Sequence, residues 1–139
     1  MPVIFWKSKN MHNKILFEGQ SRKQLRFHEM NVILFLSEYF DTDIICIHPG
    51  FGKTPDLRMN GVEWELKSPQ GNGAKTIENI LKKAAKQSSN IILDLSRIKM
   101  NSNQAISRTK YYLHNNKHGI KKLLVITKSR KVIDFVNEL

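Results

Sequence analysis

Apolar positions along the chain alternate between helical spacing and short continuous runs. Apolar residues recur every three or four positions across residues 21–40, 75–87 and 103–117, which predicts helices there. Ser21 is the expected N-cap of the first helix, and Gly119 is expected to mark the end of the third. Helices that alternate with strands predict an α/β fold with a mixed sheet. Short apolar runs predict strands at residues 3–6, 15–17, 43–47, 91–95, 123–127 and 131–135.

The strongest local signal is a β-hairpin centred on Asn60-Gly61. Asn-Gly between two alternating runs is typical of a two-residue hairpin turn. Counting outward from this turn places Asp56 directly opposite Glu65, with their Cβ atoms about 5 Å apart. Two like charges so close destabilise a sheet unless a positive group lies between them. A divalent cation is the simplest such group, because Mg²⁺ and Mn²⁺ prefer carboxylate oxygens.

Two further charged residues belong to this candidate metal site. Strand alternation places Lys67 on the same face as Glu65, where it can stabilise charge on a phosphate or orient a water molecule. Glu29 lies between Leu25 and Val32 on the apolar stripe of the preceding helix. A carboxylate in that position is costly unless it is paired or bound to metal, so Glu29 is a candidate third metal contact.

Each of these residues also has a plainer interpretation. Asp56 and Glu65 suit a solvated face whose charges are bridged by Arg58 or Lys67. Glu29 suits a pair with a histidine or an arginine of the core. Both alternatives remain open from the sequence.

Length and composition restrict the class of protein. With 139 residues, 40% of them hydrophobic and 25% charged, the chain has the composition of one globular domain. We expect residues 1–20 to be an N-terminal extension and residues 21–135 to form the core. No apolar run approaches the roughly 18 residues of a membrane span, and the N-terminus does not resemble a signal peptide. The single cysteine, Cys46, excludes an intramolecular disulfide and a cysteine-rich zinc site.

Charge points to a phosphate-rich partner. The chain carries 23 Lys and Arg against 12 Asp and Glu, a net charge of +11. No acidic residue lies between Asp94 and Asp134, a segment that holds ten Lys and Arg residues. Neutralising phosphates with such residues releases counterions and favours nucleic-acid binding. A solvated basic face is the alternative. Tyr111 and Tyr112 suit base stacking, although one of them is expected in the core.

The acids and the lysine resemble the motif of the PD-(D/E)xK nuclease superfamily. The motif runs from Pro55-Asp56 through the hairpin to Glu65-Leu66-Lys67, after a helix that carries Glu29. More narrowly, residues 55–95 resemble the C-terminal toxin domains of contact-dependent growth inhibition (CdiA-type) proteins, and the likeness extends over about residues 22–135. This resemblance implies a restriction-endonuclease-like three-layer sandwich, in which helices flank a central mixed β-sheet.

The resemblance also implies roles for individual residues. Asp56 and Glu65 would bind metal, Lys67 would be the catalytic lysine, and Glu29 would be the helix acid. Lys75 and Gln87 would be secondary phosphate or active-site contacts. The charge of the acid-free segment, independently of the resemblance, predicts nucleic-acid contacts at Arg108, Lys110, Lys121 and Lys122.

The expected function is that of a metal-dependent endonuclease, an interbacterial toxin domain that cleaves tRNA in the cytoplasm of a target cell. Mg²⁺ is the favoured metal, with Mn²⁺ and Zn²⁺ as alternatives. An acidic immunity protein is the expected partner, and an activating host protein is left open. A DNA endonuclease of restriction or repair type is the competing interpretation, as is a non-catalytic nucleic-acid-binding module on the same fold. Because no long delivery region follows Met1, we expect an excised toxin domain or a free-standing relative.

Overall fold

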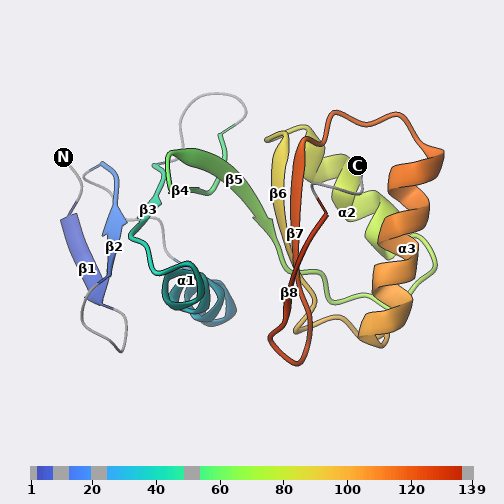
Figure 1. Cartoon of the computed structure of the whole chain (residues 1–139), viewed down its shortest axis with the longest axis horizontal. Coiled ribbons are helices and arrows are strands. Elements are labelled where there is room, and N and C mark those ends of the chain that lie inside the picture. The colour runs from blue at the N-terminus through green and yellow to red at the C-terminus, as the bar shows by residue number, and fades with distance from the viewer. Residues whose placement is uncertain (1–2, 8–12, 20–24, 49–53, 136–139) are drawn as a thin grey trace. The chain divides into compact units, whose positions relative to one another are not determined.

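The part of the chain that the structure describes folds into three helices and a mixed β-sheet, which confirms the α/β class (Figure 1). The computed structural model describes residues 3–7, 13–19, 25–48 and 54–135. The helices are α1 (Phe27–Phe40), α2 (Thr76–Ala85) and α3 (Ser102–Asn115). The strands are β1 (Val3–Lys7), β2 (Lys14–Phe17), β3 (Ile44–Cys46), β4 (Leu57–Met59), β5 (Val62–Lys67), β6 (Asn90–Asp94), β7 (Lys122–Ile126) and β8 (Val132–Asp134).

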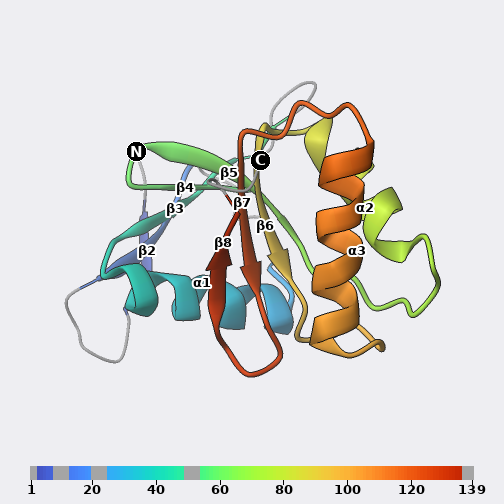
Figure 2. The same cartoon turned by 45° about the vertical axis from the view of Figure 1, so that its right-hand side comes forward.

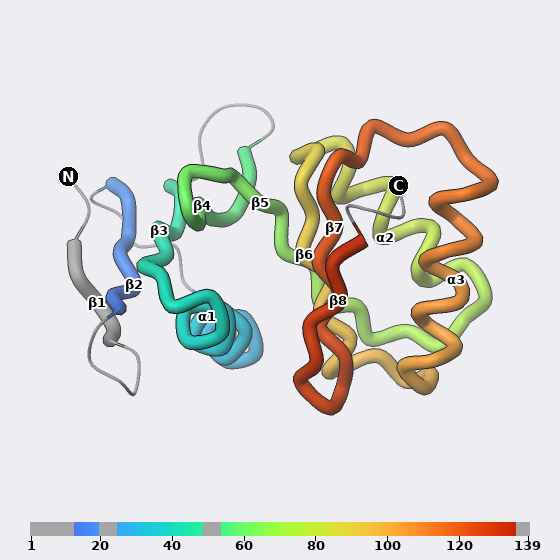
Figure 3. The backbone as a smooth tube through the Cα atoms, in the orientation of Figure 1, coloured from blue at the N-terminus to red at the C-terminus, as the bar shows by residue number. Residues whose placement is uncertain are grey.

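The chain divides into two compact units, Met1–Trp64 and Glu65–Leu139. The boundary falls inside β5, so the strand passes from the first unit into the second without a linker (Figure 3). The expectation that residues 1–139 form a single domain stays a prediction.

The first unit is built from β1 to β4, α1 and the start of β5. Strand β2 pairs with β1 in antiparallel and with β3 in parallel, and β3, β4 and β5 follow in antiparallel order. The segment expected as an N-terminal extension therefore contributes two strands to the sheet. Helix α1 packs against β2. The buried side chains of this unit include Ile15, Phe17, Val32, Ile33, Leu36, Ile44 and Leu57.

The hairpin of the first unit has the predicted register. Leu57 pairs with Trp64, and Met59 pairs with Val62, which leaves Asn60 and Gly61 in the turn. Both turn residues have positive φ, 53° for Asn60 and 76° for Gly61. Two positive φ values in succession define the hairpin turn that Asn-Gly favours.

Helix α1 begins at Phe27, later than the predicted start at residue 21. The predicted N-cap, Ser21, lies outside the described residues, and Arg26 holds the N-cap position. The Arg26 backbone N donates a hydrogen bond to Glu29 Oε1 at 3.0 Å. The Glu29 side chain, in the first turn, thus accepts from the N–H of the N-cap residue, and the helix starts without a Ser or Thr cap.

Helix α3 ends at Asn115, ahead of the predicted terminator Gly119. The side-chain amides of Asn115 and Asn116 donate to the backbone oxygens of Tyr111 and Tyr112, at 2.8 and 3.1 Å. These bonds satisfy carbonyl groups of the last turn, so no glycine is needed to end the helix.

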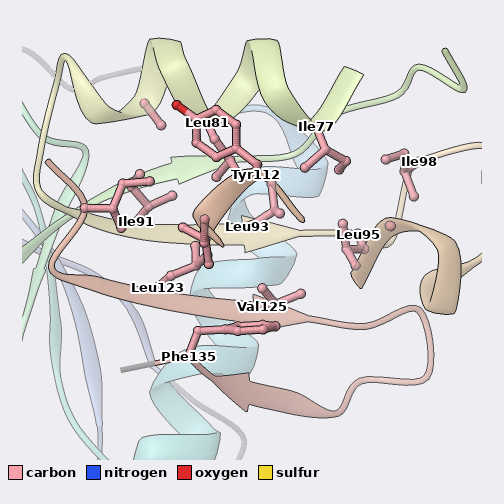
Figure 4. Close-up of a cluster of buried hydrophobic side chains, with 14 of the residues drawn as sticks. Ile77, Leu81, Ile91, Leu93, Leu95, Ile98, Tyr112, Leu123, Val125 and Phe135 are labelled. Atoms are coloured by element: carbon pink, nitrogen blue, oxygen red, sulfur yellow. The ribbon is translucent and has the colours of Figure 1, made fainter. Parts of the chain in front are cut away.

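In the second unit, α2 and α3 cover one face of the strands. Strand β6 pairs in parallel with β5 and β7, and β8 closes the edge in antiparallel. The two helices pack against each other on the same side of β6 and β7 (Figure 2). Their apolar faces meet the sheet in one buried cluster, in which Ile77, Leu81 and Leu93 are fully buried (Figure 4).

Candidate functional site

Glu65 and Lys67 form an ion pair on β5. Lys67 Nζ lies 3.2 Å from Glu65 Oε2. The two residues share a face of the strand because they are two positions apart. The Glu65 side chain is buried, with 6% of its surface exposed, whereas that of Lys67 is 27% exposed. The pair therefore places a buried carboxylate beside a cation that reaches solvent.

Asp56 belongs to the first unit and lies immediately before β4. Its backbone N donates to Trp64 O at 2.9 Å, and its backbone O accepts from Ile47 N at 3.0 Å. Leu57 and Trp64 form the pair of the hairpin farthest from the turn. Asp56 is the residue before Leu57, and Glu65 is the residue after Trp64. The predicted hairpin register is confirmed from Met59–Val62 out to Leu57–Trp64, whereas the predicted opposition of Asp56 and Glu65 stays a prediction. Glu65 itself pairs in parallel with Ile91 of β6.

Glu29 has a different environment from the one predicted. It lies in the first turn of α1, is half-buried, and accepts the capping hydrogen bond from Arg26 N. The carboxylate is thus satisfied by backbone, and neither a histidine nor an arginine side chain is needed to explain its position. Its role as a third metal contact stays a prediction.

Arg58, named as one possible bridge between Asp56 and Glu65 on a solvated face, pairs with other carboxylates. Its guanidinium lies 3.0 Å from Glu63 and 3.4 Å from Glu18. The hydrogen bond with Glu63 and the charge of Glu18 raise the pKa of Arg58 above its ordinary value, against the opposing effect of burial. Arg58 is therefore engaged with two other carboxylates of the first unit.

The donor chemistry of the acids suits Mg²⁺. Within the described ranges, no three His, Cys, Asp or Glu side chains gather into a group able to hold a metal ion. Mg²⁺ does not require such a group, since it keeps several water molecules and binds through one or two carboxylates together with substrate phosphates. Asp56 in the first unit and Glu65 in the second each offer a carboxylate, and their joint binding of a metal stays a prediction.

Asp94 is a buried acid that the sequence analysis did not select. It is the last residue of β6 and has no exposed surface. Its carboxylate accepts three hydrogen bonds, from Ser68 Oγ at 2.9 Å, Ser96 N at 3.1 Å and Ser96 Oγ at 2.9 Å. Because Ser68 follows Lys67, Asp94 fixes the chain directly after the candidate catalytic lysine. An acid at the carboxyl end of a buried parallel strand was the available signal.

The predicted nucleic-acid contacts all lie in the second unit. Lys75, Lys110 and Lys121 are exposed, whereas Gln87, Arg108 and Lys122 are half-buried. Of the two adjacent tyrosines, Tyr111 is 63% exposed and Tyr112 is 3% exposed, as expected if one belongs to the core.

Comparison with known proteins identifies the family. Residues 53–132 match the family described as the contact-dependent growth inhibition CdiA C-terminal domain. The match spans more than half of the chain, and the chain belongs to this family. No curated protein matches the chain.

A solved structure shares the fold. It is the CdiA-CT/CdiI toxin and immunity complex from Burkholderia pseudomallei, which is 17% identical. The similarity covers 85% of this chain and 96% of the solved chain, with a TM-score of 0.58. Among the described residues, no helix has the length and apolar character needed to cross a membrane.

Proposed function

We propose that this domain is a metal-dependent endonuclease, with tRNA as its favoured substrate, and the toxin of a CdiA-type protein that acts in the cytoplasm of a target cell. The observation that carries the proposal is the buried Glu65 held 3.2 Å from Lys67. Burying a carboxylate costs free energy, so a strand that does this in contact with a partly exposed lysine suits a chemical role. The same strand continues from the hairpin that Asp56 precedes.

Each residue has a part in the proposed reaction. Asp56 and Glu65 would hold the divalent cation, with Mg²⁺ favoured over Mn²⁺ and Zn²⁺. The cation would supply Lewis acidity toward the scissile phosphate and a lowered pKa of bound water. Lys67 would stabilise negative charge on the phosphate or orient the attacking water. Glu29 is proposed as the helix acid that supports this set.

The detailed fold is part of the same proposal. A helix, the hairpin, and then the β5-α2-β6 connection occur in the order typical of the PD-(D/E)xK superfamily. We therefore propose the restriction-endonuclease-like arrangement, with a mixed sheet between helical layers.

An acidic immunity protein is the proposed partner. The solved structure with the same fold is a toxin and immunity complex. A chain with a net charge of +11 binds an acidic surface in preference to a basic one, because complementary charge steers association.

A substrate panel tests the proposed activity. Purified protein would be incubated with total bacterial RNA and with plasmid DNA, in Mg²⁺ and in EDTA, beside Asp56→Asn. Discrete tRNA fragments that need Mg²⁺ and are absent with Asp56→Asn are the expected result. Cleavage of DNA alone would replace the proposal with a restriction or repair endonuclease. Binding of nucleic acid without cleavage of either substrate would replace it with a non-catalytic module.

A further inference from the structure

A hollow of about 380 Å³ lies between α2 and α3 in the second unit. It is lined by Glu78, Gln104, Ser107, Arg108 and Tyr111. Helix geometry explains this lining, because positions 104, 108 and 111 are four and three residues apart and share one face of α3. Glu78, in the first turn of α2, lines the hollow from the other helix.

Tyr111 offers an aromatic ring at this hollow. Its side chain is 63% exposed, whereas the adjacent Tyr112 is 3% exposed within the apolar cluster. A large exposed ring beside hydrogen-bonding side chains is a typical platform for a stacked nucleobase. Core packing accounts for Tyr112 and leaves the exposure of Tyr111 unexplained.

Arg108 is held in place with spare donor capacity. Its Nη1 donates to the backbone O of Ala74 at 3.0 Å, which ties α3 to the loop between β5 and α2. Its Nε is buried and, within the described structure, donates no hydrogen bond. A guanidinium has five N–H donors, and the bond to Ala74 uses one of them, so Arg108 keeps Nη donors for a ligand that enters the hollow it lines.

The charges around the hollow favour a nucleic acid over a neutral ligand. Lys75 and Lys82 lie three residues before and four residues after Glu78, on the same side of α2, and both are exposed. Together with Arg108 the two lysines supply three positive charges, and Glu78 supplies one negative charge. Lys75 and Lys82 do not line the hollow, but helical spacing places them near Glu78, where they suit the phosphates on either side of a base stacked on Tyr111.

We propose that this hollow, the α2-α3 pocket, binds an unpaired nucleobase of the RNA substrate. The base stacks on Tyr111, and its edge meets the polar groups of Glu78, Gln104 and Ser107. Arg108 and the two flanking lysines bind the adjacent phosphates. The inference rests on the proposed function only in taking RNA as the ligand.

Fluorescence binding tests the proposal without requiring cleavage. A short single-stranded RNA with one 2-aminopurine would be titrated into the protein in EDTA, because stacking on an aromatic ring quenches this base. Wild type and Tyr111→Phe are expected to bind and quench. Tyr111→Ala is expected to bind about tenfold more weakly and to lose the quenching. Tyr39→Ala is the matched control, since Tyr39 is an exposed tyrosine of α1 in the first unit (53% exposed).

The outcomes separate this proposal from the proposed function. Unchanged binding and quenching by Tyr111→Ala would overturn the pocket and leave the nuclease proposal standing. Quenching that depends on Tyr111 in a protein that cuts no RNA would support the pocket and overturn the nuclease proposal. Loss of immunity-protein binding by Tyr111→Ala, with RNA binding intact, would identify the hollow as a protein-docking surface and overturn the nucleobase proposal.

Discussion

Burial makes Glu65 and Lys67 depend on each other at the residue scale. A buried carboxylate carries a desolvation penalty of several kcal/mol, which a nearby cation partly offsets. Removal of either partner leaves the other charge without the opposite charge that compensates it. Isosteric replacements such as Glu65→Gln therefore test chemistry better than truncation does, because they retain the shape of the side chain.

Asp94 is expected to matter for stability in a similar way. Asp94→Ala removes the acceptor of three hydrogen bonds, two from Ser96 and one from Ser68. Unsatisfied buried donors cost about 1–3 kcal/mol, so we expect the free energy of unfolding to fall by about 2 kcal/mol. Urea unfolding followed by far-UV circular dichroism measures this loss. An unchanged urea midpoint would show that Asp94 contributes no net stability.

Tyr112 is expected to make the stability of the fold depend on pH. Burial raises the pKa of the Tyr112 hydroxyl above 10.0, with a further contribution from the charge of Glu78. The neutral form is thus favoured in the folded state, and its stabilisation is fully present below the unfolded pKa. Stability should fall as the pH rises from about 10 toward the folded pKa, because only the unfolded state then loses the proton. Thermal unfolding between pH 8 and 11 should show this decline in wild type and a smaller one in Tyr112→Phe.

At the element scale, the hairpin could be predicted and the ends of α1 and α3 could not. Asn60-Gly61 fixes both the turn and the register, because few dipeptides adopt two positive φ values. Helix α1 instead begins at a cap formed by Arg26 N and Glu29, which lacks the usual small polar N-cap residue. For the same reason the sequence could not show that the Glu29 carboxylate caps this helix, because the pattern shows an acid on a helix and not its backbone partner.

Two glycine substitutions test the turn. Gly61→Ala forces an L-residue into φ 76°, although nothing lies within 4 Å of the added Cβ. We expect a loss of about 1 kcal/mol in the free energy of unfolding, which arises from the backbone alone.

Gly119→Ala is the matched control, because Gly119 also has open space around it and lacks a positive φ. It should leave stability unchanged or raise it slightly. Equal urea midpoints for the two variants would contradict the turn geometry.

At the scale of the whole molecule, basic charge concentrates in one part of the chain. The acid-free segment lies in the second unit, where Lys110 and Lys121 are exposed. Its composition could be predicted from the sequence. The α2-α3 pocket, which this segment helps to line, could not be predicted, because it depends on how α2 packs against α3.

The salt dependence of RNA affinity should reflect the positive charge of this segment. In EDTA, Lys110→Gln and Lys121→Gln should each make the plot of log affinity against log salt concentration less steep by about 1. Lys14→Gln in β2 is the control and should leave the slope unchanged. Slopes identical to wild type for both segment variants would place the phosphate contacts elsewhere.

Two variants of β5 test most directly whether Glu65 takes part in RNA cleavage. Glu65→Gln and Glu63→Gln make the same chemical change two residues apart, at a buried glutamate and at an exposed glutamate that pairs with Arg58. The measurement is the initial rate of tRNA cleavage in saturating Mg²⁺. We expect Glu63→Gln to cut at the wild-type rate and Glu65→Gln to lose about 100-fold or more. Cleavage by Glu65→Gln at the wild-type rate would contradict the proposed site.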